Sequence, residues 1–278
     1  MRWLALHIGV ISMIDYPQIV EIKEIIEETP TIKTFKFDWD SDKFGLPNPG
    51  EFLMLWNFKD EKPMSISSIA SGELSVTVKN IGEFTSQLHD LNAGDKIGVR
   101  GSYGSGFNTN FTDKNLLVIG GGVGMAPVTA LTYKLIEKSN NVDVIIAGVN
   151  KNELLFYNQL KDTDVNIYPC TDDGSFGYEG YASDCLNDLL KNNSYDYAFV
   201  CGPEIMMIGI FNILEDAGIC ADYSLERYMK CALGLCGQCC VDNTGWRICV
   251  EGPVFSSDKV RQIEEFGKYR RDASGVKY

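Results

Sequence analysis

Five of the nine cysteines of this 278-residue chain lie close together near its C-terminal end. Four of them, Cys231, Cys236, Cys239 and Cys249, are spaced C-x4-C-x2-C, then nine residues, then C. Four thiolates can hold a structural zinc ion or an iron–sulfur cluster, and cysteines can also pair as disulfides. The spacing therefore predicts one of these three kinds of site, and the other segments must distinguish between them.

A glycine-rich segment, VIGGGVGMAPV, runs from Val118 to Val128 after an apolar strand pattern. Glycines let a backbone approach a ligand closely, and the helix expected to follow presents free N–H groups to a phosphate. The segment is not the G-x-G-x-x-G fingerprint, because Met125 and Pro127 stand where a third glycine would be sought. Alone it is also compatible with a tight turn. Followed by alternating strands and helices, it predicts a dinucleotide site.

Two further segments are candidates for contacts with the dinucleotide, and the first of them is expected at the same edge of the predicted sheet. CGPEIMM begins at Cys201 and turns sharply at Gly202 and Pro203 into a helix, which is either a plain helix start or a nicotinamide site. TDDGSFG offers Asp172 to the ribose of an adenosine, where a 2′-phosphate would instead need Arg or Lys. We therefore expect NAD(H) to be preferred over NADP(H).

KPMSIS, from Lys62, and GEFTSQ, from Gly82, lie in the first half of the chain. A cation with hydroxyls, and the N–H groups of a helix start, suit a pyrophosphate, which favours FAD over FMN. The alternative interpretation is a turn and a helix N-cap.

The elements that position these segments change in type near Asp113. Residues 18–100 alternate apolar and polar residues at period two, as in TIKTFKF and ELSVTVK, and predict a small barrel with one short helix from about Thr85 to before Gly94. Beyond it, apolar strands alternate with helices expected at 126–137, 153–161, 183–190 and from Pro203 to before Gly218, with ADYSLE as a fifth strand. This alternation is typical of a parallel sheet covered on both faces.

Composition limits the possible partners and compartments. A formal charge of −13 argues against nucleic-acid binding, which needs an excess of Lys and Arg. The first fourteen residues form an apolar run too short to span a bilayer, without a small-residue cleavage site before Asp15. We expect a buried first strand there, or a natural start at Met13, and a cytoplasmic protein without membrane attachment. Because the cytoplasm keeps thiols reduced, disulfides become the weakest of the three candidates.

Together these segments resemble the ferredoxin–NADP reductase superfamily, in which an FAD-binding barrel precedes a pyridine-dinucleotide domain. The superfamily motifs R-P-x-S, G-G-G-x-G-x-A-P and C-G-P stand here as KPMS, GGGVGMAP and CGPEIMM, over nearly the whole chain from residue 18. The Arg of the first motif is Lys62, which keeps the charge but loses the bidentate fork. The plant-type cysteine spacing, the closing CVEGPVF and TDDGSFGYEG are similar to electron-transfer subunits of type B dihydroorotate dehydrogenase.

The resemblance implies a multidomain α+β chain with a small C-terminal [2Fe–2S] subdomain. Its expected parts are an N-terminal extension at 1–15, an antiparallel FAD-binding β-barrel at 16–113, an α/β parallel-sheet NAD-binding domain at 114–226 and the cluster-binding segment at 227–278. The cluster ligands are then the four cysteines of the motif, and Cys201 is the catalytic candidate beside the nicotinamide. The implied FAD-binding residues are Lys62, Pro63, Met64, Ser65, Thr77, Val78, Lys79, Gly82, Thr85 and Ser86. The implied NAD-binding residues are Gly120, Gly121, Gly122, Gly124, Met125, Pro127, Asp172, Gly202 and Pro203.

A flavin converts between the two-electron chemistry of nicotinamide and the one-electron chemistry of a cluster. By resemblance, electrons pass from dihydroorotate to FMN in a partner catalytic subunit, and then through [2Fe–2S] and FAD to NAD+, serving pyrimidine (UMP) biosynthesis. The two chains are expected to join in a two-plus-two heterotetramer. The alternatives are a subunit of an NAD(P)H–ferredoxin oxidoreductase or of a hydrogenase diaphorase, and a non-enzymatic zinc-binding interaction module.

Overall fold

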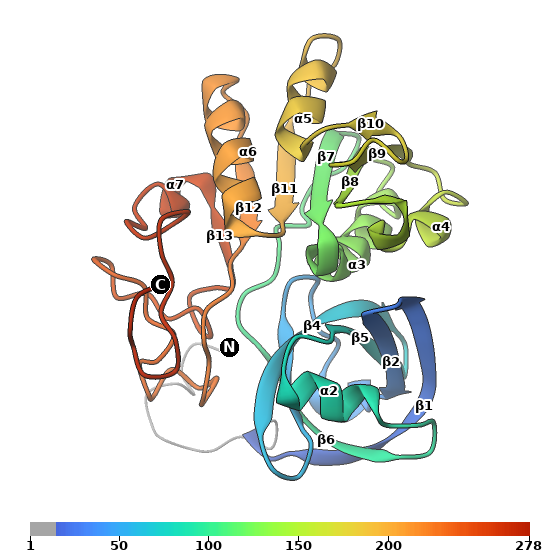
Figure 1. Cartoon of the computed structure of the whole chain (residues 1–278), viewed down its shortest axis with the longest axis vertical. Helices are drawn as coiled ribbons and strands as arrows, with labels where there is room; N and C mark the ends of the chain where they lie inside the picture. Colours follow the sequence, from blue (N-terminus) through green and yellow to red (C-terminus); the bar gives the residue numbers. More distant parts are fainter. Residues whose placement is uncertain (1–14) are drawn as a thin grey trace.

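The computed structural model describes residues 15–278, and the first third of this range forms a closed antiparallel barrel (Figure 1). Its strand order is β1-β2-β5-β4-β3-β6, and alternate residues such as Phe35, Phe37 and Leu53 fill the interior. The strands are β1 (Gln18–Thr29), β2 (Ile32–Asp38), β3 (Phe52–Trp56), β4 (Glu61–Ala70), β5 (Glu73–Lys79) and β6 (Lys96–Tyr103). Two short helices, α1 (Ser41–Phe44) and α2 (Glu83–His89), lie in the connections.

Helix α2 is shorter than predicted and begins earlier. It starts two residues before Thr85, because the Thr85 hydroxyl accepts a hydrogen bond from the Gly82 amide at 3.0 Å and so acts from inside the first turn. It ends at His89, well before Gly94.

The chain after the barrel forms a seven-stranded sheet of order β10-β9-β8-β7-β11-β12-β13, parallel except at β13. The strands are β7 (Asn115–Gly121), β8 (Asn141–Gly148), β9 (Asn166–Thr171), β10 (Tyr178–Glu179), β11 (Tyr197–Cys201), β12 (Ala221–Ser224) and β13 (Val254–Ser256). Neighbouring residues of β7 point to opposite faces, so Val118 packs with α3 (Met125–Ile136) and Ile119 packs in the cluster of α5 (Ala182–Leu190) and α6 (Glu204–Asp216). The predicted covering of both faces by helices is confirmed.

Two local predictions need correction. The helix expected at 153–161 is broken into η4 (Lys151–Glu153) and α4 (Tyr157–Leu160), because Phe156 adopts a left-handed backbone with φ of 63°. The strand expected over ADYSLE ends at Ser224. Strands β10 and β13 were not predicted, and the interpretation of residues 1–14 lies outside the described residues.

The C-terminal segment after β12 leaves the sheet, carries the cysteines and returns as β13 and α7 (Ser257–Val260). β13 pairs antiparallel with β12, and Phe255 is 1% exposed within the core of the sheet domain. The segment lies along both the sheet and the barrel (Figure 1). Within residues 15–278 the helices are all too short or too polar to cross a membrane.

Candidate functional site

Two glycine-containing turns contact each other at the carboxyl edge of the parallel sheet, as predicted. β7 and β11 are neighbours, and Gly120 pairs with Cys201 at their ends. A Cβ atom on Gly124 would lie 2.6 Å from the Cys201 carbonyl oxygen, closer than such atoms approach. Glycine at position 124 is therefore needed for the glycine loop to pack on the turn after β11.

Within the glycine loop, the residues have different surroundings. Gly122 has φ of +53°, and a Cβ there would meet nothing within 4 Å, so this position borders open space. A Cβ on Gly120 or Gly121 would instead strike the sulfur of Met125 or Met206. Met125 and Pro127 are buried and pack inside the domain. The loop thus offers a ligand its backbone near Gly122, followed by η3 (Gly122–Gly124) and α3.

Cys201 is half-buried at the end of β11, and the turn of Gly202 and Pro203 leads from it into α6. Burial raises the pKa of the Cys201 thiol to about 12. A hydrogen bond from the Ser224 hydroxyl favours the thiolate and lowers the pKa, but burial has the larger effect. The side chain is therefore a neutral thiol at physiological pH. It can contact a bound ring and donate a weak hydrogen bond, but it is not poised as a base.

Asp172 lies in the turn after β9, on the same edge of the sheet as the glycine loop but two strands away. Its amide donates to the Gly148 carbonyl at 3.2 Å, which fixes the turn to the end of β8. The next residue, Asp173, accepts a hydrogen bond from the Ser175 amide at 2.9 Å, and contacts with Ser175 lower its pKa. Both carboxylates are exposed, so the turn presents negative charge at the edge of the sheet.

The predicted flavin residues of the barrel lie on two strand segments that separate from each other. The ladder between β4 and β5 ends at the pair Ile66 and Val76. Residues 62–65 of β4 continue beyond this pair with only β3 beside them, and residues 77–79 of β5 continue with only β2. Lys62, Pro63, Met64 and Ser65 are all half-buried. Each segment leaves one backbone edge without a ladder partner, which fits a polar ligand lying between them.

Side chains in these segments differ in what they could offer. Lys62 Nζ lies 2.6 Å from Asp60 and 3.5 Å from the Tyr228 hydroxyl; partial burial opposes its charge, but the contact with Asp60 outweighs it and raises the pKa. The Thr77 hydroxyl donates to Ser67 at 2.8 Å inside the barrel wall, and Val78 is 1% exposed. At Thr77 and Val78 a ligand would meet the backbone, whereas Lys79 is half-buried and accessible.

The turn before α2 uses its own hydroxyls. Thr85 accepts from the amides of Ile81 and Gly82 and donates to the Gly82 carbonyl, and Ser86 donates to Asn80 at 2.7 Å. A Cβ on Gly82 would meet nothing within 4 Å. Gly82 is therefore the open position of this turn, and the two hydroxyls stabilise the helix start.

The four cysteines of the motif form two contacting pairs in this structure. Side-chain hydrogen bonds join Cys231 to Cys236 and Cys239 to Cys249, and Cys249 also interacts electrostatically with Cys231. The contact with Cys249 is the main cause that lowers the pKa of Cys239 to about 6, and it raises the pKa of Cys249. Within residues 15–278 no three His, Cys, Asp or Glu side chains gather around one point as ligands of a single ion. Two pairs of thiols suit a group with two irons, each held by two thiolates.

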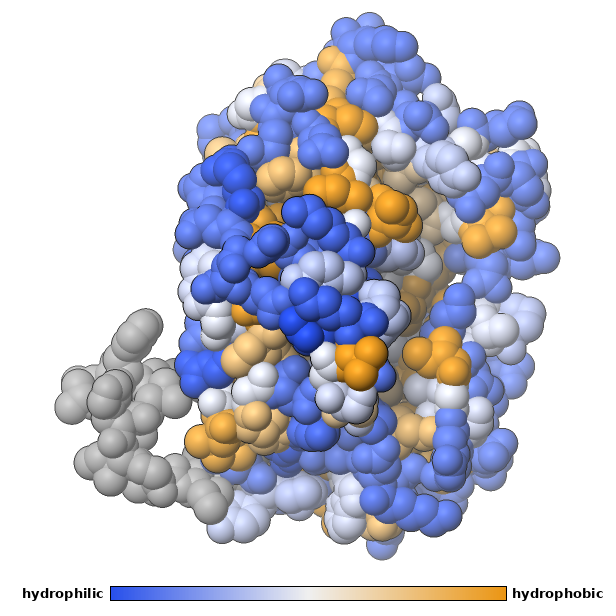
Figure 2. All heavy atoms as spheres, turned by 60° about the vertical axis from the view of Figure 1, so that its left-hand side comes forward, coloured by the Kyte–Doolittle hydropathy of each residue, from blue (hydrophilic) through white to orange (hydrophobic). Residues whose placement is uncertain are grey.

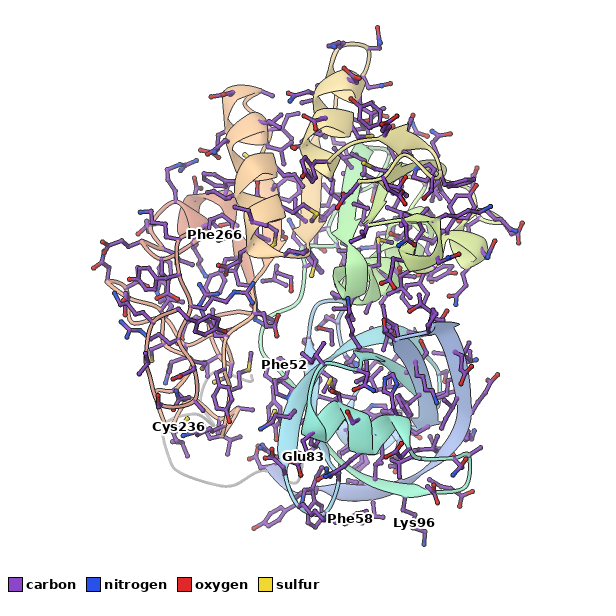
Figure 3. The ribbon with its side chains drawn as sticks, in the orientation of Figure 1. Phe52, Phe58, Glu83, Lys96, Cys236 and Phe266 are labelled. Carbon is purple, nitrogen blue, oxygen red and sulfur yellow. The ribbon has the colours of Figure 1, made fainter. Side chains whose placement is uncertain are left out.

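The loop from Cys231 to Cys236 has the surroundings of a thiolate. The amides of Leu233 and Cys236 both point to the Cys231 sulfur at 3.4 Å. Cys231 is half-buried, Cys236 is exposed, and Cys239 and Cys249 are each 3% exposed. Cys236 lies at the end of the segment level with the barrel, and Phe266 lies at its other end, near α6 (Figure 3). This donor set, with soft sulfurs and backbone N–H groups, fits an iron–sulfur cluster.

Sequence reasoning missed the charged residues that fasten this loop. Arg100 of β6 is 8% exposed and donates to the Cys231 carbonyl at 3.1 Å, and Arg247 donates to the Gly234 carbonyl at 3.0 Å. Arg227 is buried between Glu204, directly after the C-G-P motif, and Glu265. The ion pair of Arg247 and Glu251 could have been predicted, because the two residues are four positions apart on either side of Cys249. The hydrogen bond of Arg100 to the Cys231 carbonyl could not, because it depends on the tertiary fold.

Leu233 and Leu235, with GPVF (residues 252–255), are the apolar residues near the cysteines from which we expected a contact patch; the alternative was that they pack beneath the cluster. Leu233 is half-buried and Leu235 is 82% exposed, as a patch requires of Leu235, but Val254 and Phe255 are 7% and 1% exposed. The inclusion of GPVF in the patch is therefore wrong, because β13 buries these residues in the sheet. The face formed by the C-terminal segment and the neighbouring helices is mainly hydrophilic with separate apolar areas (Figure 2).

Comparison with known proteins gives consistent results. Residues 226–261 match the model of the iron–sulfur cluster binding domain of dihydroorotate dehydrogenase B. The chain is 47% identical over 261 residues to a protein of Methanothermobacter thermautotrophicus named "Probable dihydroorotate dehydrogenase B (NAD(+)), electron transfer subunit", covering 93% of this chain and 96% of the relative. A protein of Methanocaldococcus jannaschii with the same name is 45% identical, covering 94% and 98%.

Among solved structures, an NADH-dependent reduced ferredoxin–NADP oxidoreductase matches with a TM-score of 0.79 and 24% identity over 94% of both chains. A ferredoxin–NADP+ reductase of Plasmodium falciparum matches with a TM-score of 0.61 and 18% identity, over 72% of this chain and 91% of that one. These likenesses support the fold of barrel and parallel sheet. On the extent and identity of the sequence matches, the chain belongs to the family of electron-transfer subunits of dihydroorotate dehydrogenase B (NAD+).

Proposed function

We propose that this chain carries electrons between a dihydroorotate-oxidising partner subunit and NAD+, in pyrimidine biosynthesis. FAD, [2Fe–2S] and NAD are the groups it uses. When bound, the flavin exchanges electron pairs with nicotinamide and single electrons with the cluster. We further propose that the partner is an FMN-containing catalytic subunit and that the two kinds of chain join in a two-plus-two heterotetramer.

The observation that carries the proposal is the contact between the cysteine loop and the barrel strands proposed for the flavin. Tyr228, three residues before Cys231, reaches Lys62 of β4. Arg100 of β6 donates to the Cys231 carbonyl and pairs with Glu61, the neighbour of Lys62. One end of the proposed cluster site is thus fastened to the strand segment proposed for the flavin. An electron carrier needs this closeness, whereas a separate zinc-binding module has no use for it.

In the proposed nicotinamide site, the chain's own residues bind and orient. The backbone at Gly122 and the start of α3 present N–H groups to the phosphates. Gly202 and Pro203 would place the neutral Cys201 thiol beside the ring, where it would exclude water and hold the ring without exchanging a proton. Asp172 would approach the adenosine ribose and disfavour a 2′-phosphate.

In the proposed flavin site, the Lys62 ammonium group would pair with the pyrophosphate. The same ammonium group also pairs with Asp60, so the two anions would share it. The free backbone edges of residues 62–65 and 77–79, with Gly82, supply the remaining polar contacts. Cys231, Cys236, Cys239 and Cys249 are the proposed cluster ligands, and Cys240 remains a spare thiol.

The test is reconstitution with the FMN-containing catalytic subunit. Alone, the chain should oxidise NADH with artificial acceptors and leave dihydroorotate unchanged; with its partner it should reduce NAD+ at the expense of dihydroorotate. Leu235→Glu should weaken the complex, because Leu235 is the exposed apolar residue of the cluster loop. Failure to bind that subunit, together with rapid electron exchange with ferredoxin or a hydrogenase, would assign the chain to the alternative class of oxidoreductase.

A further inference from the structure

The loop that begins at Cys231 is held from outside by two arginines that come from different parts of the fold. Arg100, on barrel strand β6, donates through Nη1 to the Cys231 carbonyl at 3.1 Å and to the Tyr103 hydroxyl at 3.0 Å. Arg247, within the cysteine segment itself, donates through Nη1 to the Gly234 carbonyl at 3.0 Å.

Each arginine is itself fixed by one glutamate. Nε and Nη2 of Arg100 both donate to the Glu61 carboxylate at 2.6 Å, in the bidentate geometry that holds a guanidinium plane. Arg247 pairs with Glu251 in the same way, at 3.1 and 2.5 Å. The carboxylates also balance the charge, so each pair adds little net charge near the loop.

The same loop also carries amides that approach the sulfur. Those of Leu233 and Cys236 lie 3.4 Å from the Cys231 sulfur. Peptide groups are planar, so Arg247, by holding the Gly234 carbonyl, also orients the Leu235 amide, which makes a further backbone hydrogen bond to the Cys231 sulfur. Arg100, by holding the Cys231 carbonyl, fixes the peptide next to the one that carries the Leu233 amide. Hydrogen bonds to cysteinyl sulfur stabilise the more negative, reduced form of a cluster and raise its reduction potential.

We propose that Arg100 and Arg247 are positioning residues that set the reduction potential of the cluster by holding the amides of the Cys231 loop against its sulfur. The inference rests on the proposed function in one respect, that the four cysteines hold the cluster. It adds that the potential depends in part on the barrel, through Arg100, and is therefore tied to the domain proposed to hold the flavin.

The test compares Arg100→Lys, Arg247→Lys and Glu61→Gln with the unaltered holoprotein. Redox titration followed by EPR gives the midpoint potential and the g-values of the cluster, and iron content and near-UV/visible spectra show that it is present. Lysine keeps the positive charge but lacks the planar fork of donors with which arginine binds a glutamate and a carbonyl at the same time. Both lysine variants should therefore lower the midpoint potential of the cluster and alter its g-values. We expect a shift toward a tenfold change in the equilibrium between oxidised and reduced cluster, which is about 59 mV for one electron.

Glu61→Gln separates position from charge. Removing a negative charge near the cluster would by itself raise the potential, whereas releasing Arg100 from its anchor should lower it. The matched control is Arg261→Lys, which changes an exposed arginine that pairs with Glu215 and Asp258 instead of a loop carbonyl and should leave the potential unchanged.

A potential that rises in Glu61→Gln, or that is unchanged in both lysine variants while iron is retained, would overturn the inference and leave the proposed function intact. Loss of iron in the lysine variants, with the fold retained by circular dichroism, would support the positioning role in its strongest form. Unaltered protein without iron would instead contradict the proposed function.

Discussion

Replacing Gly124 by alanine should damage the proposed nicotinamide site, because the added Cβ would clash with the backbone of the neighbouring turn. The added atom would lie 2.6 Å from the Cys201 oxygen and 2.7 Å from both the Cys201 carbon and the Gly202 Cα. The turns must separate by at least 0.4 Å to reach the 3.0 Å that real Cβ contacts respect. All three atoms belong to the backbone, so no flexible side chain can move aside.

The size of the effect follows from this geometry. Overpacking of this kind costs about 1–3 kcal/mol of folding free energy. A displacement of the order of 1 Å at a reacting centre can reduce the rate about 100-fold. Since the required shift is about half of that, we expect kcat/KM for NADH with an artificial acceptor to fall roughly 10-fold, with FAD and iron content unchanged.

The assay is steady-state NADH oxidation with ferricyanide on holoprotein of measured flavin and iron content. Gly209→Ala is the control, because a Cβ at this position in α6 would meet only Ser183, at 3.8 Å. That change should be neutral or stabilising by up to about 1 kcal/mol, as alanine favours a helix. If Gly124→Ala retained the same kcat/KM as Gly209→Ala, the contact between the two turns would have no role in nicotinamide binding.

Four further changes test the remaining proposals. Lys62→Ala should weaken FAD retention by about 1.5–3 kcal/mol through loss of a charge-assisted contact; unchanged affinity by fluorescence titration would show that KPMS is misassigned. Serine at any of the four motif cysteines should abolish or alter the [2Fe–2S] EPR signal, whereas Cys240→Ser should not, and zinc in place of iron would contradict the cluster. Asp172→Arg should raise kcat/KM for NADPH relative to NADH; efficient NADPH use by the unaltered chain would refute the role of Asp172. Burial raises the pKa of Cys170 to about 12, so the folded thiol keeps its proton at pH values where the unfolded one loses it. The stabilisation from the protonated Cys170 thiol is therefore complete below about pH 9 and declines toward pH 12. The free energy of unfolding, measured with urea at each pH, should fall less across this range in a Cys170→Ala variant than in the unaltered chain.

The sequence predicted the elements whose side chains repeat at a regular period. β2 and β5 were evident because Phe35, Phe37, Leu74 and Val76 alternate with polar residues, and the barrel core uses this alternation. α3 was placed within one residue, because an apolar strand and a glycine loop precede it. Such patterns are local, so they can be read without the fold.

Features that depend on distant partners could not be predicted in the same way. β13 is three residues long and lies within a cysteine-rich segment, so only its pairing with β12 defines it as a strand. Arg100 is one charged residue in GVRGSYG, and nothing nearby marks it as the donor to a carbonyl 131 positions later. Thr85 was predicted near the start of its helix, but only the hydrogen bond from Gly82 shows that it lies inside the first turn.

The pairing of β12 with β13 has a consequence for the chain entropy of folding. These adjacent strands form a hairpin, and the Leu225 amide extends it by donating to the Pro253 carbonyl at 2.9 Å. The whole cysteine region is therefore the connection of that hairpin, roughly thirty residues where 2–5 are usual. Three doublings of loop length add about 2 kcal/mol to the free energy of closing it. A group that bridges Cys231 to Cys249 inside this connection shortens the free chain, so loading the cluster should also stabilise the far edge of the sheet.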